Sequence, residues 1–127
     1  MKELTKAEEQ IMQVLWDIKK GFVKDIIEKM PEPRPAYTTV STIVRILEKK
    51  GFVAYNAYGK THEYYPLVEK KDYTHQLFRG MLNGYFGSSI RQMVSFFSRE
   101  KDLSVAELEE LKNIIDDEIR KQKDNMQ

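Results

Sequence analysis

The segment at residues 35–51, PAYTTVSTIVRILEKKG, predicts a helix with two chemically different faces. Apolar residues follow the i, i+3, i+4, i+7 spacing of a buried stripe: Val40, Ile43, Val44 and Leu47. The opposite face carries short hydroxyls near the start and cations further along: Thr38, Ser41, Thr42, Arg45 and Lys49. The segment by itself fits an ordinary solvated surface and a DNA-reading helix equally well.

A β-hairpin is predicted immediately after this helix. β-branched and aromatic residues flank a turn at Gly59 and Lys60, with one strand opening at Phe52 and the other running from Thr61 to Leu67. A reading helix followed by a hairpin with a cationic tip is the winged-helix form of the helix-turn-helix. In that form the helix enters the major groove of DNA and the wing contacts the flanking backbone. We therefore expect Lys60 to contact a phosphate.

Two further helices are expected upstream. Thr5 and Glu8 have the spacing of a capping box, and an apolar stripe continues from there to about Ile18. A second helix, roughly residues 23–30, ends where three prolines begin a stiff loop. The expected fold is mostly α with a small β-hairpin. It consists of a winged helix-turn-helix DNA-binding domain at residues 1–68, followed by a helical dimerisation region at residues 69–127.

The carboxy-terminal region predicts helices with more apolar surface than lone helices leave in water. A break is expected near Gly87 and Ser88, and Ser104 with Glu107 forms a capping box that begins the last helix. The simplest partner is a second copy of the chain in a two-fold homodimer, and folding back as a monomer is the alternative. The expected dimer contacts are Leu77, Leu82, Ile90, Val94, Leu108, Leu111 and Ile115.

The net charge of +1, from 21 Lys and Arg against 20 Asp and Glu, is low for a protein that coats DNA. Binding must then depend on a few cations and should weaken steeply with salt. The candidates are Lys6, Lys24, Arg45, Lys49, Lys50 and Lys60. The absence of cysteine excludes a disulfide scaffold and a thiolate metal site. No secretory signal or long apolar run is present, so we expect a cytoplasmic protein.

Catalysis is not expected. The two histidines, His62 and His75, have no neighbouring nucleophile arrangement, and the sequence contains no Gly-rich phosphate loop or His-Glu-x-x-His motif. We therefore predict no catalytic residue, no metal site, no cofactor and no small-molecule substrate. The serious alternative to DNA binding is a winged helix whose residues 38–45 contact another protein.

Four segments resemble the BlaI/MecI repressors of penicillinase and methicillin-resistance operons: KELTKAEEQIMQVLW, TVSTIVRILEKKGFV, GKTHEYYPL and DLSVAELEELKNII. The resemblance spans nearly the whole chain. It implies a dimeric transcriptional repressor that sits on an inverted-repeat operator of double-stranded DNA. The operator contacts that it implies are Thr38, Thr39, Ser41, Thr42, Arg45 and Lys60. Tyr37, at the start of the helix, is a further candidate for a phosphate contact, and packing under the loop at Pro35 is the alternative.

The resemblance also implies release of the operator by proteolysis. A membrane metalloprotease that responds to a β-lactam would cut the carboxy-terminal region near Phe96 and Phe97. The cut would leave the two winged-helix domains of the dimer, here called the reading heads, unpaired. In this chain Phe96 occupies a position where a relative has Asn. Copper-responsive relatives sense metal through paired cysteines, and this chain departs from that branch because it has none.

Overall fold

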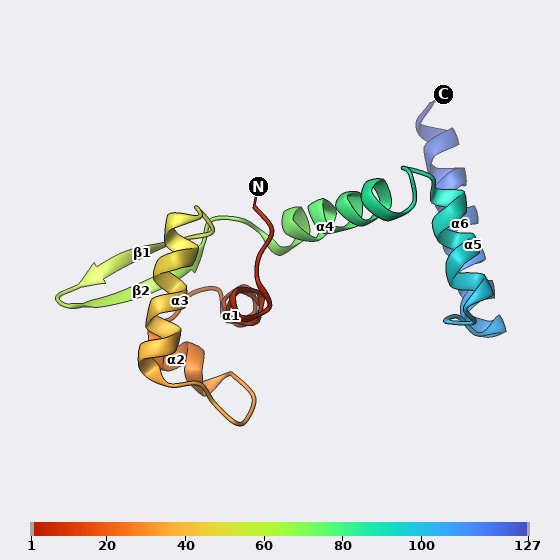
Figure 1. Ribbon diagram of the computed structural model, residues 1–127. Helices are drawn as coiled ribbons and strands as arrows, with labels where there is room; N and C mark the ends of the chain where they lie inside the picture. The colour runs from red at the N-terminus through yellow and green to blue at the C-terminus, as the bar shows by residue number, and fades with distance from the viewer. Residues whose placement is uncertain (1, 127) are drawn as a thin grey trace. The chain divides into compact units, whose positions relative to one another are not determined.

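The computed structural model describes residues 2–126 and divides between Arg79 and Gly80 into two compact units (Figure 1). This division lies later in the chain than the domain boundary expected after residue 68. The reason is that Tyr73, on the first part of helix α4 (Lys70–Tyr85), is only 2% exposed and belongs to the core of the first unit. The start of α4 is therefore part of the amino-terminal unit.

The first unit begins with three helices, α1 (Lys6–Ile18), α2 (Val23–Glu28) and α3 (Tyr37–Lys49). The capping box that begins α1 is confirmed: the hydroxyl of Thr5 accepts from the backbone N–H of Glu8, whose carboxylate accepts from the N–H of Thr5. The second helix is shorter than expected, because the N–H groups of Lys29 and Met30 bond to carbonyls three residues back, in a tighter last turn. Pro31 follows this turn and disfavours further α-helix.

Strands β1 (Val53–Tyr58) and β2 (Thr61–Pro66) form the expected antiparallel hairpin, with Tyr58 paired to Thr61 across the turn. Gly59 has φ of +63°, a conformation that glycine adopts without steric cost. The backbone of Gly21 forms two hydrogen bonds with Tyr64, at 2.9 and 2.8 Å, and so joins the outer edge of β2. The hairpin is thus tied to the loop between α1 and α2, and the order of elements is that of a winged helix.

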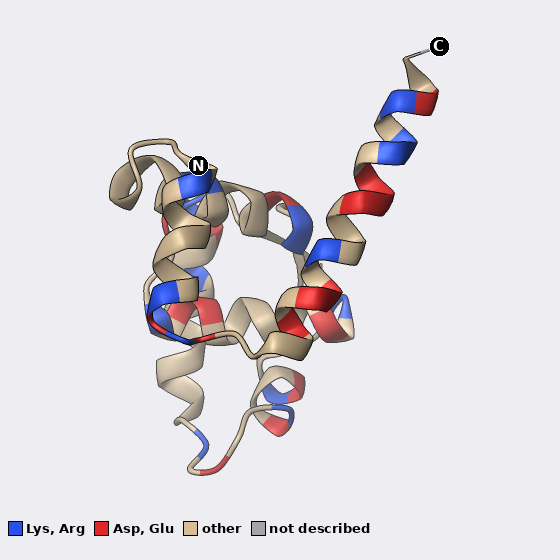
Figure 2. Cartoon of the chain, turned by 90° about the vertical axis from the view of Figure 1, so that its right-hand side faces the viewer, with Lys and Arg blue, Asp and Glu red and all other residues tan. Residues whose placement is uncertain are grey.

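The second unit contains the end of α4, α5 (Ile90–Arg99) and α6 (Val105–Asn125). The expected break between α4 and α5 is confirmed, since Gly87 and Ser88 both have positive φ values, 56° and 64°. The Ser104–Glu107 capping box at the start of α6 is confirmed as well. Basic and acidic residues alternate along α6 toward the carboxy terminus (Figure 2). Within residues 2–126, no helix has both the length and the apolar character needed to cross a membrane.

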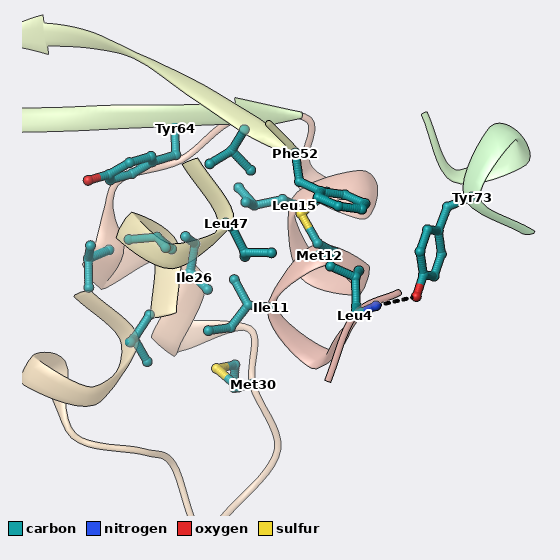
Figure 3. Close-up of a cluster of buried hydrophobic side chains, with 14 residues drawn as sticks. Leu4, Ile11, Met12, Leu15, Ile26, Met30, Leu47, Phe52, Tyr64 and Tyr73 are labelled. Carbon is teal, nitrogen blue, oxygen red and sulfur yellow. Dashed lines mark hydrogen bonds between the residues drawn. The ribbon is translucent and has the colours of Figure 1, made fainter. Parts of the chain in front are cut away.

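The buried stripe of α3 lies at the centre of the first unit's core (Figure 3). Val40, Val44 and Leu47 are fully buried, and Ile43 packs against the core at its edge. They share this core with side chains from every other element of the unit: Ile11, Met12, Leu15, Ile26, Phe52, Val53 and Tyr64 among them. One face of α3 is therefore fixed by packing, which holds its opposite face in a defined orientation.

The start of α4 is anchored to the first unit by two aromatic side chains. The hydroxyl of Tyr73 accepts a 2.8 Å hydrogen bond from the backbone N–H of Leu4, drawn as a dashed line in Figure 3. Trp16 donates from Nε1 to the carbonyl of Val68 at 2.9 Å, and its ring lies 6.0 Å from that of Tyr73. Burial raises the pKa of Tyr73, so the phenol stays protonated and neutral in this packing.

Candidate nucleic-acid interface

The face of α3 opposite the core is open to solvent. Thr38, Thr39, Thr42, Arg45 and Lys49 are exposed, Tyr37 is 58% exposed, and Ser41 is intermediate. Two side chains bond within the helix. The hydroxyl of Thr42 donates to the carbonyl of Thr38 at 2.9 Å, and Nη2 of Arg45 donates to Oγ of Ser41 at 3.0 Å. Because a guanidinium carries five N–H groups, Arg45 keeps donors for a base edge or a phosphate.

A cleft of about 580 Å³ lies beside this face, between α3, the start of α2 and the hairpin. Its lining residues are Phe22, Val23, Lys24, Tyr37, Ser41, Arg45, Lys60, Thr61, His62 and Tyr64. Five of the residues named from the sequence as candidate DNA contacts therefore meet in one place: Lys24, Tyr37, Ser41, Arg45 and Lys60. Thr38, Thr39, Thr42 and Lys49 lie on the outer side of the helix and do not line the cleft.

The cleft is electropositive. Lys24, Arg45 and Lys60 come from three different elements, and none of its lining residues is an Asp or Glu. Burial raises the pKa of the Tyr64 phenol, with a further contribution from the carboxylate of Glu48 that Arg45 partly offsets. Tyr64 therefore stays a neutral hydrogen-bonding group. Three cations around a neutral aromatic wall suit an anionic ligand.

Phe22 and His62 are among the cleft residues to which the sequence assigned no binding role. Phe22 packs its ring 6.0 Å from that of Tyr58 on the hairpin, and His62 stacks on Tyr55 with ring centroids 3.9 Å apart and planes 6° apart. Sequence periodicity places neither near α3. The pairing of Gly21 with Tyr64 and the contact of Phe22 with Tyr58 bring the start of α2 to the hairpin.

Lys50, one of the candidate DNA-contacting cations, has another partner. Its ammonium lies 2.7 Å from the carboxylate of Glu8, which is 4% exposed on α1. Burial raises the pKa of Glu8, but hydrogen bonds from Lys50 and Thr5 outweigh that effect, and the pKa ends below its ordinary value of 4.5. The pair joins α1 to the C-terminal end of α3 and so helps to fix the orientation of that helix.

We expect Glu8→Gln to lower the free energy of unfolding by about 1–3 kcal/mol at pH 7. Because the folded-state pKa of Glu8 is depressed, its stabilisation is present above about pH 4.5 and is lost as the pH falls through the folded value. The wild-type stability should therefore fall more steeply than that of the variant in acid. Urea unfolding followed by Trp16 fluorescence at several pH values measures this. Glu9→Gln, a more exposed neighbour, is the control, and equal curves for the two variants would contradict the prediction.

The second unit exposes apolar side chains along two helices. Among the described residues, neither α5 nor α6 contains a buried residue. Of the expected dimer contacts, Leu77, Ile90, Val94 and Ile115 are exposed, and Leu108 and Leu111 are intermediate. Leu82 differs from the expectation, because it is only 1% exposed within the single chain and so is not available for a dimer contact. Further exposed apolar residues not named from the sequence include Met81, Tyr85, Val105, Ile114 and Ile119.

The expected cleavage residues, Phe96 and Phe97, lie inside helix α5. Their rings lie 5.7 and 6.2 Å from that of Phe86, at the end of α4. With Met81 and Tyr85 these three rings line an apolar cavity of about 470 Å³. Because a protease binds its substrate as an extended chain, α5 must unwind locally before a cut can occur here.

The model of the penicillinase repressor family matches residues 4–117. The chain belongs to the penicillinase repressor family. Among its relatives is the methicillin resistance regulatory protein MecI of Mammaliicoccus sciuri, 32% identical over 114 residues, which cover 89% of this chain and 93% of the relative. The penicillinase repressor of Bacillus licheniformis is 24% identical over 123 residues, 96% of each chain.

One solved structure supports the fold of this family member. The complex structure of hsRosR-S4 aligns with 80% of this chain and 90% of that chain, with a TM-score of 0.52 and 18% sequence identity. At that identity the likeness concerns the fold alone. Family membership and winged-helix fold thus agree with the expectations drawn from the sequence.

Proposed function

We propose that this chain is a cytoplasmic transcriptional repressor that binds an inverted-repeat operator in double-stranded DNA as a homodimer. The observation that carries the proposal is the two-sided α3. Val40, Val44 and Leu47 of its apolar stripe are fully buried, while hydroxyls and Arg45 face solvent beside a cationic cleft. The exposed face of α3 enters the major groove, and Lys60 on the hairpin contacts the flanking backbone. The names of the two curated relatives, a methicillin resistance regulatory protein and a penicillinase repressor, support repression as the outcome.

The proposal that the dimer forms through the second unit rests on its exposed surface. A 21-residue helix without a buried residue, together with the exposed apolar side chains of α5, leaves an apolar face that a second copy of the chain would cover. Two-fold symmetry then places two reading heads on the two halves of an inverted repeat.

Release of the operator by a regulatory membrane metalloprotease, in a pathway that responds to a β-lactam, is part of the same proposal. The relatives' names connect the family with resistance to such antibiotics. A cut between Phe96 and Phe97 would separate α6 from the rest of the chain, and so remove much of the apolar surface assigned to the dimer. Mass spectrometry of the fragments formed with the sensor protease would test the site, and a cut outside α5 would contradict it.

The DNA-binding proposal is tested by the double substitution Thr42→Ala with Arg45→Ala. A lost base contact costs about 1–3 kcal/mol, so the loss of one contact alone should lower the affinity for the chain's own upstream DNA by roughly 5- to 150-fold per half-site, and the loss of both should lower it further. Gel-shift titration at two salt concentrations measures the affinity, and the wild-type affinity should weaken steeply with salt.

Thr74→Ala with Arg79→Ala is a matched control, because Thr74 makes the same bond to the carbonyl four residues back, at 2.7 Å, and both residues are exposed on α4. Equal retention of DNA by the two double variants would show that α3 does not read the operator. Contact of α3 with a protein partner would then be the better interpretation.

A further inference from the structure

The cleft between α3 and the hairpin contains a titratable group among its cations. His62 lines the cleft together with Lys24, Arg45 and Lys60. Its ring lies flat against Tyr55, with centroids 3.9 Å apart and planes 6° apart, and it contacts Tyr64 edge-on at 6.2 Å. Two aromatic neighbours thus hold the imidazole in place at the wall of an electropositive cleft. Imidazole is the side chain whose ordinary titration falls between pH 5 and 8.

The groups that face His62 come from all three elements around the cleft. α2 contributes Lys24, α3 contributes Tyr37 and Arg45, and the hairpin contributes Lys60, Tyr55 and Tyr64. Two acidic residues lie near this wall without lining the cleft: Glu48 of α3 acts on Tyr64, and Asp25 of α2 accepts a 2.9 Å hydrogen bond from the backbone N–H of Phe22. A negative charge in the cleft would therefore have to come from a ligand.

We propose that the cleft binds a phosphodiester of the DNA backbone, held by Lys24, Lys60 and the protonated ring of His62. This inference rests on the proposed binding of duplex DNA and assigns it two residues, Lys24 and His62, beyond the face of α3. The cleft is suitably placed for this contact. When α3 lies in the major groove and the wing contacts the flanking backbone, one sugar-phosphate backbone of the DNA passes between them. A protonated imidazole supplies two N–H donors and a positive charge to that strand.

Operator binding should then take up protons. A phosphate beside His62 favours the charged ring, so protons bind more tightly to the complex than to the protein without DNA. By linkage, DNA affinity rises as the pH falls from 8 toward 6, and the gain ends once the ring is protonated before DNA binds. The expected gain is about tenfold or less per reading head, as for one charge-assisted hydrogen bond to a phosphate.

The test uses the full-length chain and a labelled duplex of its own upstream region. Fluorescence anisotropy gives the dissociation constant at pH 6, 7 and 8 at constant ionic strength. We expect the wild type to bind more tightly at pH 6 than at pH 8, and His62→Gln to bind with an affinity that no longer changes over this pH range. His62→Phe, which keeps an aromatic ring on Tyr55 but cannot be protonated, should behave in the same way. His75→Gln, on α4 outside the cleft, is the control and should keep the pH dependence of the wild type.

A second measurement tests the phosphate contact itself. Lys24→Gln should reduce the slope of log affinity against log salt by about one per reading head, whereas Lys29→Gln, at the other end of α2 and outside the cleft, should not. Full pH dependence in His62→Gln, or an unchanged salt slope in Lys24→Gln, would overturn the inference. Wild-type binding without pH dependence would remove this inference alone. Failure of the wild type to bind DNA at any pH would remove the proposed function as well.

Discussion

Replacement of Ile115 by Asp should convert the dimer into monomers and lower the affinity for a two-half-site operator by roughly 10²- to 10⁴-fold. Ile115 is 47% exposed on α6, on the same side of the helix as Leu111 and Ile119, one turn away in each direction. A dimer through this face would bury the new carboxylate without a partner, which costs several kcal/mol. The two reading heads would then bind separately, and the gain from linking them would be lost.

The substitution should leave the fold of the single chain intact, because α6 contains no buried residue. Asn113→Asp is the matched control, because it adds the same charge to the same helix nearly half a turn away, at an exposed position. Sedimentation velocity at micromolar concentration, together with gel shifts on one and two half-sites, measures both effects. A dimer that persists in Ile115→Asp, or a wild-type chain that sediments as a monomer, would contradict the proposed interface.

Local features of this fold could be read from the sequence. The capping boxes at Thr5 and Ser104, the turn at Gly59 and the stripe of α3 each depend on residues a few positions apart, and all four are as expected. Each feature is formed by residues of a single helix or turn, so the spacing of those residues in the sequence determines its geometry. The end of α2 was misjudged by two residues, because propensity does not distinguish an α turn from the tighter turn that follows it.

Contacts between distant residues could not be read in the same way. Lys50 resembles any other lysine at the end of a reading helix, until the fold places Glu8 of α1 2.7 Å from its ammonium. Tyr73 belongs by sequence to the apolar helices, yet its hydroxyl reaches the backbone of Leu4. The cleft likewise depends on tertiary pairing, since its cations come from α2, α3 and the hairpin. Such features require the packing of several elements, for which no periodicity gives a signal.

Replacement of Leu47 by Asp should unfold the first unit and abolish DNA binding. Leu47 is fully buried in the stripe of α3, where a carboxylate would lose apolar contacts and find no cationic partner among the core side chains. The loss should exceed about 4 kcal/mol, which is comparable with the whole stability of a small domain. Ile46→Asp adds the same charge at the next position of α3, where the side chain is exposed, and should leave the unit folded.

The two units should respond to this substitution independently. The core that contains Leu47 ends at Tyr73, and the apolar face of α5 and α6 takes no part in it. We therefore expect Leu47→Asp to shift the fluorescence of Trp16, the single tryptophan, toward that of a solvated indole, while sedimentation still shows a dimer. Ile115→Asp should give the opposite pair of results, a native Trp16 signal and a monomer. If Leu47→Asp also dissociated the chains, dimerisation would depend on a folded reading head, and the second unit could not be the autonomous dimer contact proposed here.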